Sequence, residues 1–221
     1  YGSSQKILDN FSAVNYIGGD LRIYCNKIES FTPMSNLEFV GGDLKFLIDK
    51  EEETKLQSFK GFENLTTIGG KLVWATGLHT AGSSTTKNNF SNIQSFQGFN
   101  NLSSVGGFHL SIYYGDFLQF TSFKGLESLK NVKGDFIIEV ETKKSSWGLS
   151  DISALTNLET VEGDQFNIKG CYMLKDFTPL KQVLTLYQGS FSTKKNGYNP
   201  TQQQIINGEG KPVGGIKKII Y

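Results

Sequence analysis

The chain is 221 residues long, and its 22 basic and 21 acidic side chains give a formal net charge of +1. This balance offers neither the basic stripe that nucleic acid needs nor the basic amphipathic helix of a membrane-surface protein, so we expect no nucleic-acid partner. No apolar run approaches the ~18 residues of a membrane-spanning helix. The two cysteines, Cys25 and Cys171, are too few for a disulfide framework.

One short segment recurs along the chain. Its pattern is Asn-Leu-x-x-[Ile/Val]-Gly-Gly-x-[Leu/Phe], with a partial copy from Ile17, copies or variants from Asn36, Asn64, Asn101, Ser128 and Asn157, and a degenerate last copy over 182–191. Self-similarity at a period of roughly 20–50 residues indicates structural repeats. A single repeat cannot bury its own apolar edge, so the copies must stack. We therefore predict one domain over 1–221, with repeats over about 10–192 and a C-terminal cap over 193–221.

Alternating apolar residues follow each glycine pair, and a period of two is typical of a half-buried strand. The expected inward pairs are Leu21/Ile23, Leu44/Phe46, Leu72/Trp74, Leu110/Ile112, Phe136/Ile138 and Phe166/Ile168. Stacked copies would place these strands side by side in a parallel sheet. The fold class that we predict is an all-β solenoid, a right-handed parallel β-helix of about six to seven leucine-rich-repeat-like coils with a short C-terminal helical cap.

An aromatic-rich row recurs at a second position of the repeat. Its members are Phe31, Phe59, Phe96, Phe123, Ile152 and Phe177. Exposed aromatic rings could stack on sugars, but a regular place in every copy favours core packing.

Extra residues follow several of the expected strands, at 49–54, 76–92 and 141–148. Insertions at one position of a stacked repeat project from one side, which is often the binding side. The outward positions of the expected sheet also have an apolar centre, and a contiguous exposed apolar area often marks a partner site. The alternative is that the long insertion covers this face. The candidate partner-binding residues are Tyr24, Leu47, Val73, Tyr113 and Ile137 on the sheet and His79 in the insertion.

Other polar positions suggest no chemistry. Aspartates recur after the second glycine and could collect calcium, but Lys71 and Phe108 interrupt the row, so turn capping is the expected role. His79 and His109 have no motif partner, and no zinc spacing, nucleophile motif or phosphate-binding glycine loop is present. We therefore predict no catalytic, cofactor-binding or metal site, and no enzyme.

Three further expectations concern structural residues. The asparagines of the Asn-Leu corners should satisfy backbone groups. Cys25 and Cys171 should be unpaired, because five strand spacings separate them by roughly 24 Å. In the C-terminal cap, Asn199 as N-cap, Pro200 at the first position and Gly208 after the last predict a helix over 201–207. The run 216–221 should form a short strand at the same end.

Two motifs carry a family resemblance. Residues 21–28, Leu-Arg-Ile-Tyr-Cys-Asn-Lys-Ile, fit the leucine-rich-repeat core, and residues 166–171 fit its Cys variant. The Gly-Gly-Asp-Leu and Asn-Leu-x-x-Val corners resemble those of the receptor L domain of insulin and EGF receptor ectodomains. Over roughly residues 10–205 the chain is still more similar to L-domain-like surface proteins of gut-dwelling Gram-negative bacteria.

This resemblance implies an exported protein at the cell surface or outer membrane. The chain begins with Tyr1 and not with Met, so we expect that a signal peptide or a lipid anchor precedes it, and that this anchor is its only membrane contact.

The leading functional hypothesis is a non-catalytic binding or adhesion module. It would be a monomer that recognises a protein or a glycan through its sheet face and loop edge. The alternatives are a carbohydrate-active β-helix enzyme of the polysaccharide lyase type and a passive structural spacer. Because Arg22 is the only arginine, the guanidinium that commonly faces a uronate in lyases is hard to supply. A spacer would have a featureless outer face.

Overall fold

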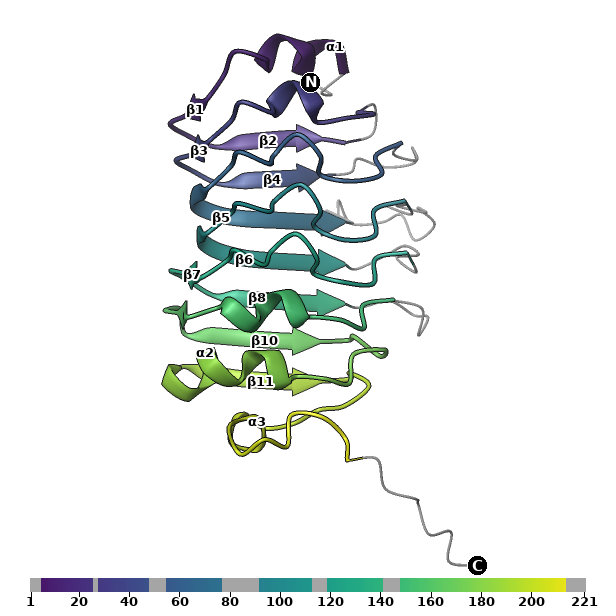
Figure 1. Ribbon diagram of the computed structural model, residues 1–221, viewed down its shortest axis with the longest axis vertical. Coiled ribbons are helices and arrows are strands. Elements are labelled where there is room, and N and C mark those ends of the chain that lie inside the picture. The colour runs from purple at the N-terminus through teal and green to yellow at the C-terminus, as the bar shows by residue number, and fades with distance from the viewer. Residues whose placement is uncertain are drawn as a thin grey trace, which may run out of the picture.

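The main element of the molecule is one parallel sheet of 11 strands (Figure 1). The computed structural model describes residues 5–25, 28–47, 55–76, 92–112, 119–140 and 148–213. The strands are β1 Tyr16–Ile17, β2 Leu21–Tyr24, β3 Phe39–Val40, β4 Leu44–Leu47, β5 Thr67–Thr76, β6 Ser104–Ile112, β7 Asn131–Val132, β8 Phe136–Val140, β9 Thr160–Val161, β10 Gln165–Lys169 and β11 Ser190–Lys194.

Equivalent residues of successive repeats lie next to one another in this sheet. One inward row consists of Leu21, Leu44, Leu72, Phe108, Phe136, Phe166 and Phe191. The strand expected after each glycine pair is therefore present, and the parallel pairing of these strands is confirmed.

The glycine corner before each strand is tightly packed. A Cβ atom added to Gly41 would lie 2.4 Å from the Gly18 carbonyl oxygen, and one added to Gly69 would lie 2.3 Å from the Gly41 oxygen. Real Cβ atoms do not approach an oxygen this closely. The corner glycines are thus required because the backbones of neighbouring repeats are in contact.

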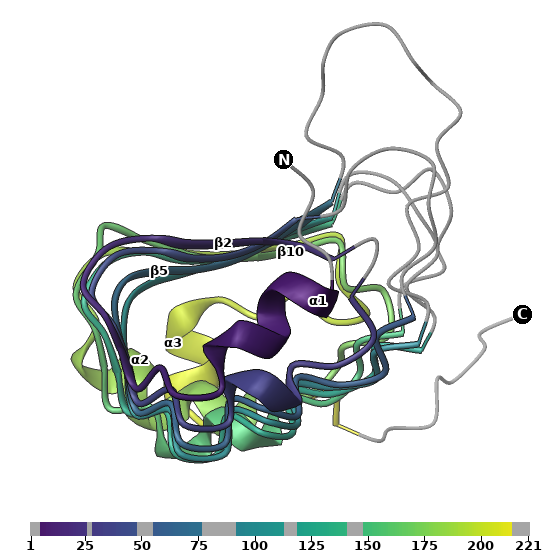
Figure 2. The same ribbon diagram turned by 90° about the horizontal axis from the view of Figure 1, so that it is seen from above.

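The wall opposite the sheet consists of turns and short helices (Figure 2). The helices of this wall are α2 Lys181–Leu186 and the 3₁₀ helices Thr32–Met34, Ser153–Asn157 and Thr178–Leu180, whereas α1 Gln5–Leu8, with the 3₁₀ helix Asp9–Phe11 that follows it, and α3 Gln202–Ile206 lie over the two ends of the core. In Figure 1, α1 lies at one end of the stack of strands and α3 at the other.

The predicted all-β, right-handed β-helix is therefore wrong. The molecule has one extensive parallel sheet combined with short helices, which is a mixed arrangement closer to the α/β class. The physical reason lies in the hydrogen bonds of the second wall. There the N–H groups of Met34, Phe62, Phe99 and Leu126 donate to the carbonyl three residues earlier, within their own turn. A backbone group used within a turn is not available for a ladder with the next repeat.

The aromatic row forms part of the core, as expected. Phe31 contacts Phe46 of β4 with ring centroids 5.4 Å apart, and Phe59 contacts Trp74 of β5 at 5.2 Å. These rings are buried. The wall and the sheet are thus joined by aromatic contacts across the core, and these rings are not available to stack on a ligand.

The predicted register of the fourth repeat was wrong by two residues. The pairing of β5 with β6 shifts between Ile68 and Lys71, because the fourth repeat is one residue shorter there. Leu72 therefore pairs with Phe108 and not with Leu110. The prediction of which side chains of this strand face inward was correct, since Phe108, Leu110 and Ile112 are all buried. The outward residue beside Val73 is consequently His109.

The C-terminal helix is present, but its N-cap is Thr201 and not Asn199. The Thr201 hydroxyl accepts from the Gln204 N–H, and the Gln204 side chain accepts from the Thr201 N–H, which is a complete capping box. Asn199 instead accepts from the N–H of Asn196. Ile205 is fully buried, so α3 covers the core at this end. Residues 216–221 lie outside the described part of the chain.

Neither Cys25 nor Cys171 is part of a disulfide, as predicted, and both are buried. Their sulfur atoms lie near the carbonyl oxygens two residues earlier, at 3.7 Å for Cys25 and 3.9 Å for Cys171. Burial raises the pKa of both thiols, so both groups stay protonated and unreactive.

Candidate functional site

The outward side chains of the sheet form two rows that run across the strands. The first row, from β2 to β11, is Arg22, Lys45, Val73, His109, Ile137, Asn167 and Ser192. The second row is Tyr24, Leu47, Ala75, Ser111, Glu139, Lys169 and Lys194.

The structure brings some of the predicted site residues together and separates others. Val73 and Ile137 are half-buried and flank His109 in the first row. Tyr24, also half-buried, and Leu47 are neighbours in the second row. Leu47 is only 7% exposed, so it contributes little contact area. Tyr113 and His79 lie outside the described residues.

His109 is the central residue of this face, and the sequence reasoning missed it. Its Nε2 atom lies 2.6 Å from the Ser111 hydroxyl oxygen. The alternation of β6, with Phe108 and Leu110 buried on either side, was the signal that could have placed it outward. We refer to Val73, His109 and Ile137 as the central patch.

Burial lowers the pKa of His109, and Lys71 adds to this effect, while Glu139 and Asp135 oppose it. The ring is therefore mainly neutral at pH 7, and it presents one donor and one acceptor nitrogen. The pairing with Ser111 does not form a catalytic triad, because in the described ranges no carboxylate hydrogen-bonds the other ring nitrogen of His109.

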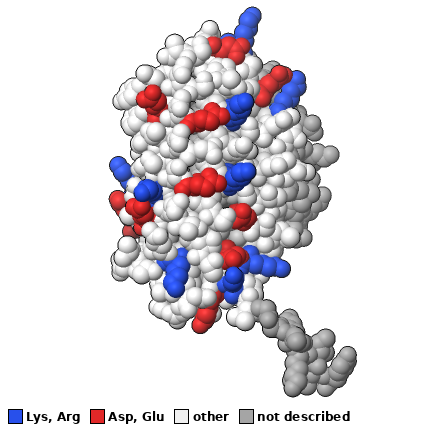
Figure 3. Space-filling view, viewed as in Figure 1, with Lys and Arg blue, Asp and Glu red and all other residues white. Residues whose placement is uncertain are grey.

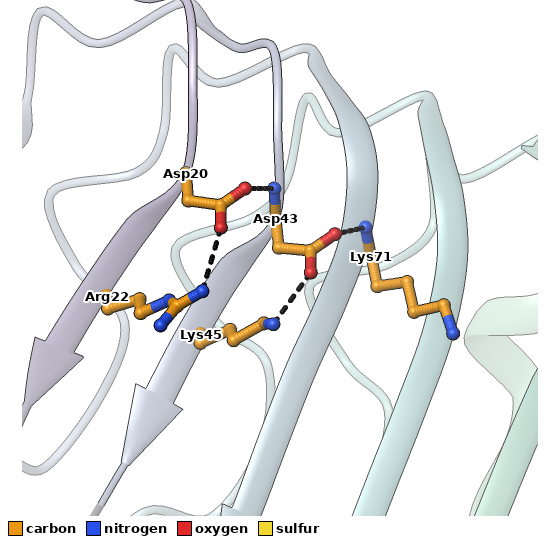
Figure 4. A network of polar contacts seen from close by, with 5 residues as sticks. All are labelled: Asp20, Arg22, Asp43, Lys45 and Lys71. Carbon is orange, nitrogen blue, oxygen red and sulfur yellow. Dashed lines mark hydrogen bonds and ion pairs between the residues drawn. The ribbon is translucent and has the colours of Figure 1, made fainter.

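Aspartates border the central patch on the N-terminal side and are used structurally (Figure 4). Asp20 Oδ1 accepts from the Asp43 N–H at 2.9 Å, and Asp43 Oδ1 accepts from the Lys71 N–H at 2.7 Å. The other oxygens pair with Arg22 at 3.1 Å and with Lys45 at 2.7 Å. These carboxylates therefore have a structural role, but they bond to the backbone of the next repeat and do not cap their own turn as expected.

The calcium alternative gains no support. The Asp135 carboxylate accepts from the Gln165 N–H at 3.0 Å, so Gln165 and not Asp164 occupies the position equivalent to Asp43. The row of aspartates is therefore interrupted a second time. Within the described ranges, no three His, Cys, Asp or Glu side chains are grouped for a metal ion.

No protein-family model, curated protein or solved structure matches this chain. Among the helices of the described residues, none has the length and apolar character needed to cross a bilayer. The resemblance to L-domain-like surface proteins therefore rests on the repeat motifs alone.

Proposed function

We propose that the chain is a non-catalytic binding module that holds another protein against the outer face of β5, β6 and β8. The observation that carries this proposal is the central patch. Val73, His109 and Ile137 are adjacent, only half-buried, and contributed by three neighbouring strands. An apolar centre with a polar rim is the usual anatomy of a protein–protein contact surface.

The chemistry of the central patch favours a protein over a sugar. Val73 and Ile137 offer aliphatic area, which is best buried against apolar side chains of a partner. Around them, Lys71, Asp135 and Glu139 place both signs of charge at the rim. The partner that fits is a folded protein with an apolar patch bordered by acidic and basic groups.

The cellular location is proposed on the repeat motifs. Because these motifs resemble those of bacterial L-domain-like surface proteins, we place the module outside the cell, tethered by a lipid anchor. The lyase alternative is less well supported. The single arginine, Arg22 in β2, is paired with Asp20 and so is not free to face a uronate. A spacer would not need the half-exposed apolar residues of the central patch.

The experiment uses purified extracellular-matrix proteins as probes. Fibronectin, laminin and type IV collagen are immobilised, and binding of the chain is measured by biolayer interferometry. The variant Val73→Glu/Ile137→Glu should lose binding. The matched control is Asn167→Glu/Ser192→Glu, which adds the same charge to the same row outside the central patch and should bind as the unaltered chain does. Binding to none of the probes, or equal binding by both variants, contradicts the proposal.

A further inference from the structure

A second surface lies on the wall opposite the sheet, where two open grooves of about 420 and 520 Å³ adjoin. Gln57 and Ser58 line both grooves, so the two form one continuous depression. The larger groove is completed by Asn92, Gln94 and Gln119. We call this surface the amide groove, and we infer that it is a binding site for a neutral oligosaccharide.

The amide side chains of the groove are available to a ligand. Gln57, Asn92, Gln94 and Gln119 are exposed, and in the described part of the chain their amides make no hydrogen bond. The corner asparagines differ in this respect, since Asn36, Asn64, Asn101 and Asn157 each donate to a carbonyl of the preceding repeat. The groove amides thus perform no comparable structural task.

The arrangement of these groups follows the repeats. Gln57 and Gln94 each stand two residues before the core phenylalanine of their repeat, Phe59 and Phe96. Neighbouring strands of a sheet are about 4.8 Å apart, which is similar to the length that one pyranose adds to an extended sugar chain. Amides from successive repeats can therefore meet successive sugar residues.

The chemistry of the lining matches sugar hydroxyls. Each amide offers both a donor and an acceptor, and so does the Ser58 hydroxyl. A sugar hydroxyl also offers both. The charged residues line only the smaller groove, where Lys55 is paired with Glu29 at 2.7 Å and Lys60 is the other charged residue. Figure 3, which views this wall, shows charges of both signs separated by wide uncharged areas. These features favour a neutral ligand over an acidic one.

A peptide fits this groove less well. Extended peptides bind mainly by pairing their main chain with free backbone groups of a sheet edge. In the amide groove, the Thr121 N–H already donates to the Gln94 carbonyl at 3.0 Å, and the Ser150 N–H to the Thr121 carbonyl at 3.0 Å. Because the Gln94 carbonyl is used internally, the side-chain amides of Gln94 and Gln119 are the groups through which this part of the groove can contact a ligand.

The test observes the side-chain amides directly. A ¹⁵N-labelled chain is titrated with neutral tetrasaccharides, namely the β-1,4-linked tetraoses of glucose, xylose and mannose and the α-1,4-linked tetraose of glucose. Tetragalacturonate serves as the acidic comparison. We expect saturable shifts of the side-chain NH₂ signals of Gln57, Asn92, Gln94 and Gln119 with at least one neutral tetraose.

Variants then locate the site. Gln94→Ala/Gln119→Ala removes two hydrogen-bonding amides and should weaken binding by about tenfold. Gln182→Ala is the matched control, since it removes an exposed glutamine of α2 away from the groove, and it should bind as the unaltered chain does. Val73→Glu/Ile137→Glu should also bind the sugar normally, which separates this site from the central patch.

Three results would overturn the inference. They are the lack of saturable shifts with all four neutral tetraoses, an unchanged affinity of Gln94→Ala/Gln119→Ala for the tetraose that binds, and binding of tetragalacturonate alone. None of them would bear on the central patch, so failure of the amide groove is distinguishable from failure of the proposed function.

Discussion

The side-chain amide of Asn101 donates to the carbonyl oxygen of Glu63, one repeat earlier in the stack, at 2.7 Å. The same contact links Asn64 to Ser35 at 2.7 Å and Asn157 to Glu127 at 2.9 Å. This confirms that the corner asparagines satisfy backbone groups. It also explains why four copies keep asparagine at this position although the two residues after the following leucine vary.

The first prediction concerns this contact. Asn101→Ala should lower the free energy of unfolding by about 1 kcal/mol, because it leaves the Glu63 carbonyl without its partner. For a chain of this size the midpoint of thermal unfolding should fall by roughly 2–4 °C. Urea and thermal unfolding measure the change. Asn92→Ala is the control, since Asn92 is exposed and its amide makes no such bond to the described residues. An equal loss in both variants would show that the contact contributes nothing.

The second prediction concerns acid stability. Burial tends to raise the pKa of Asp43, but the hydrogen bonds from the Lys45 ammonium and the Lys71 N–H outweigh it, so the pKa is lowered. A carboxyl whose folded-state pKa is lowered stabilises the fold above its unfolded pKa, near 4, and this contribution is lost as the pH falls further. Asp43→Asn should therefore reduce stability at pH 6 and have a smaller effect at pH 3.

Urea unfolding at the two pH values measures this difference. The control is Asp164→Asn, which removes an exposed carboxyl that bonds no backbone group of the described residues. A stability deficit of Asp43→Asn that is the same at pH 6 and pH 3 would contradict the role of the ionised carboxylate.

The third prediction concerns His109. Burial, helped by Lys71, lowers its pKa below the ordinary value of 6.5 despite the opposing charges of Glu139 and Asp135. A histidine with a lowered folded-state pKa stabilises the fold above pH ~6.5, and this stability is lost as the pH falls through the folded-state value. An NMR titration of the His109 ring should therefore give a pKa below 6.5. A value at or above 6.5 would show that the ring is not buried as described.

The sequence predicted some parts of this structure well. The glycine corners and the alternating pairs such as Leu44/Phe46 identified strands and their parallel pairing, because a period of two depends only on local geometry. The aromatic residues Phe59 and Phe96 were correctly placed in the core, since every copy has an apolar residue there. These are features that each repeat encodes by itself.

Other parts could not be predicted because they depend on contacts between repeats. The motif shows that Phe59 and Phe62 are apolar, but it does not show that the Phe62 N–H bonds within its own turn, so that this part of the expected β wall is a turn. The placement of His109 beside Val73 depended on a register shift between β5 and β6, which is invisible in one sequence. The central patch was therefore only partly identified, through Val73 and Ile137.

The last prediction concerns the turn glycines of the second wall. Gly98 has φ +122°, and a Cβ added to it would lie 2.1 Å from the Phe59 carbonyl oxygen of the preceding repeat. Gly98→Ala thus meets two penalties, a strained backbone and a clash with backbone that cannot easily move. Gly208 also has a positive φ, +90°, but no atom of the described residues lies within 4 Å of its added Cβ. Gly208→Ala should cost about 1–2 kcal/mol of unfolding free energy, which is the backbone penalty alone. Gly98→Ala should cost clearly more, because the stack must open locally to admit the methyl group. Urea unfolding of the two variants side by side decides the matter, and equal losses would mean that neighbouring repeats are not packed as closely at this turn as the structure shows.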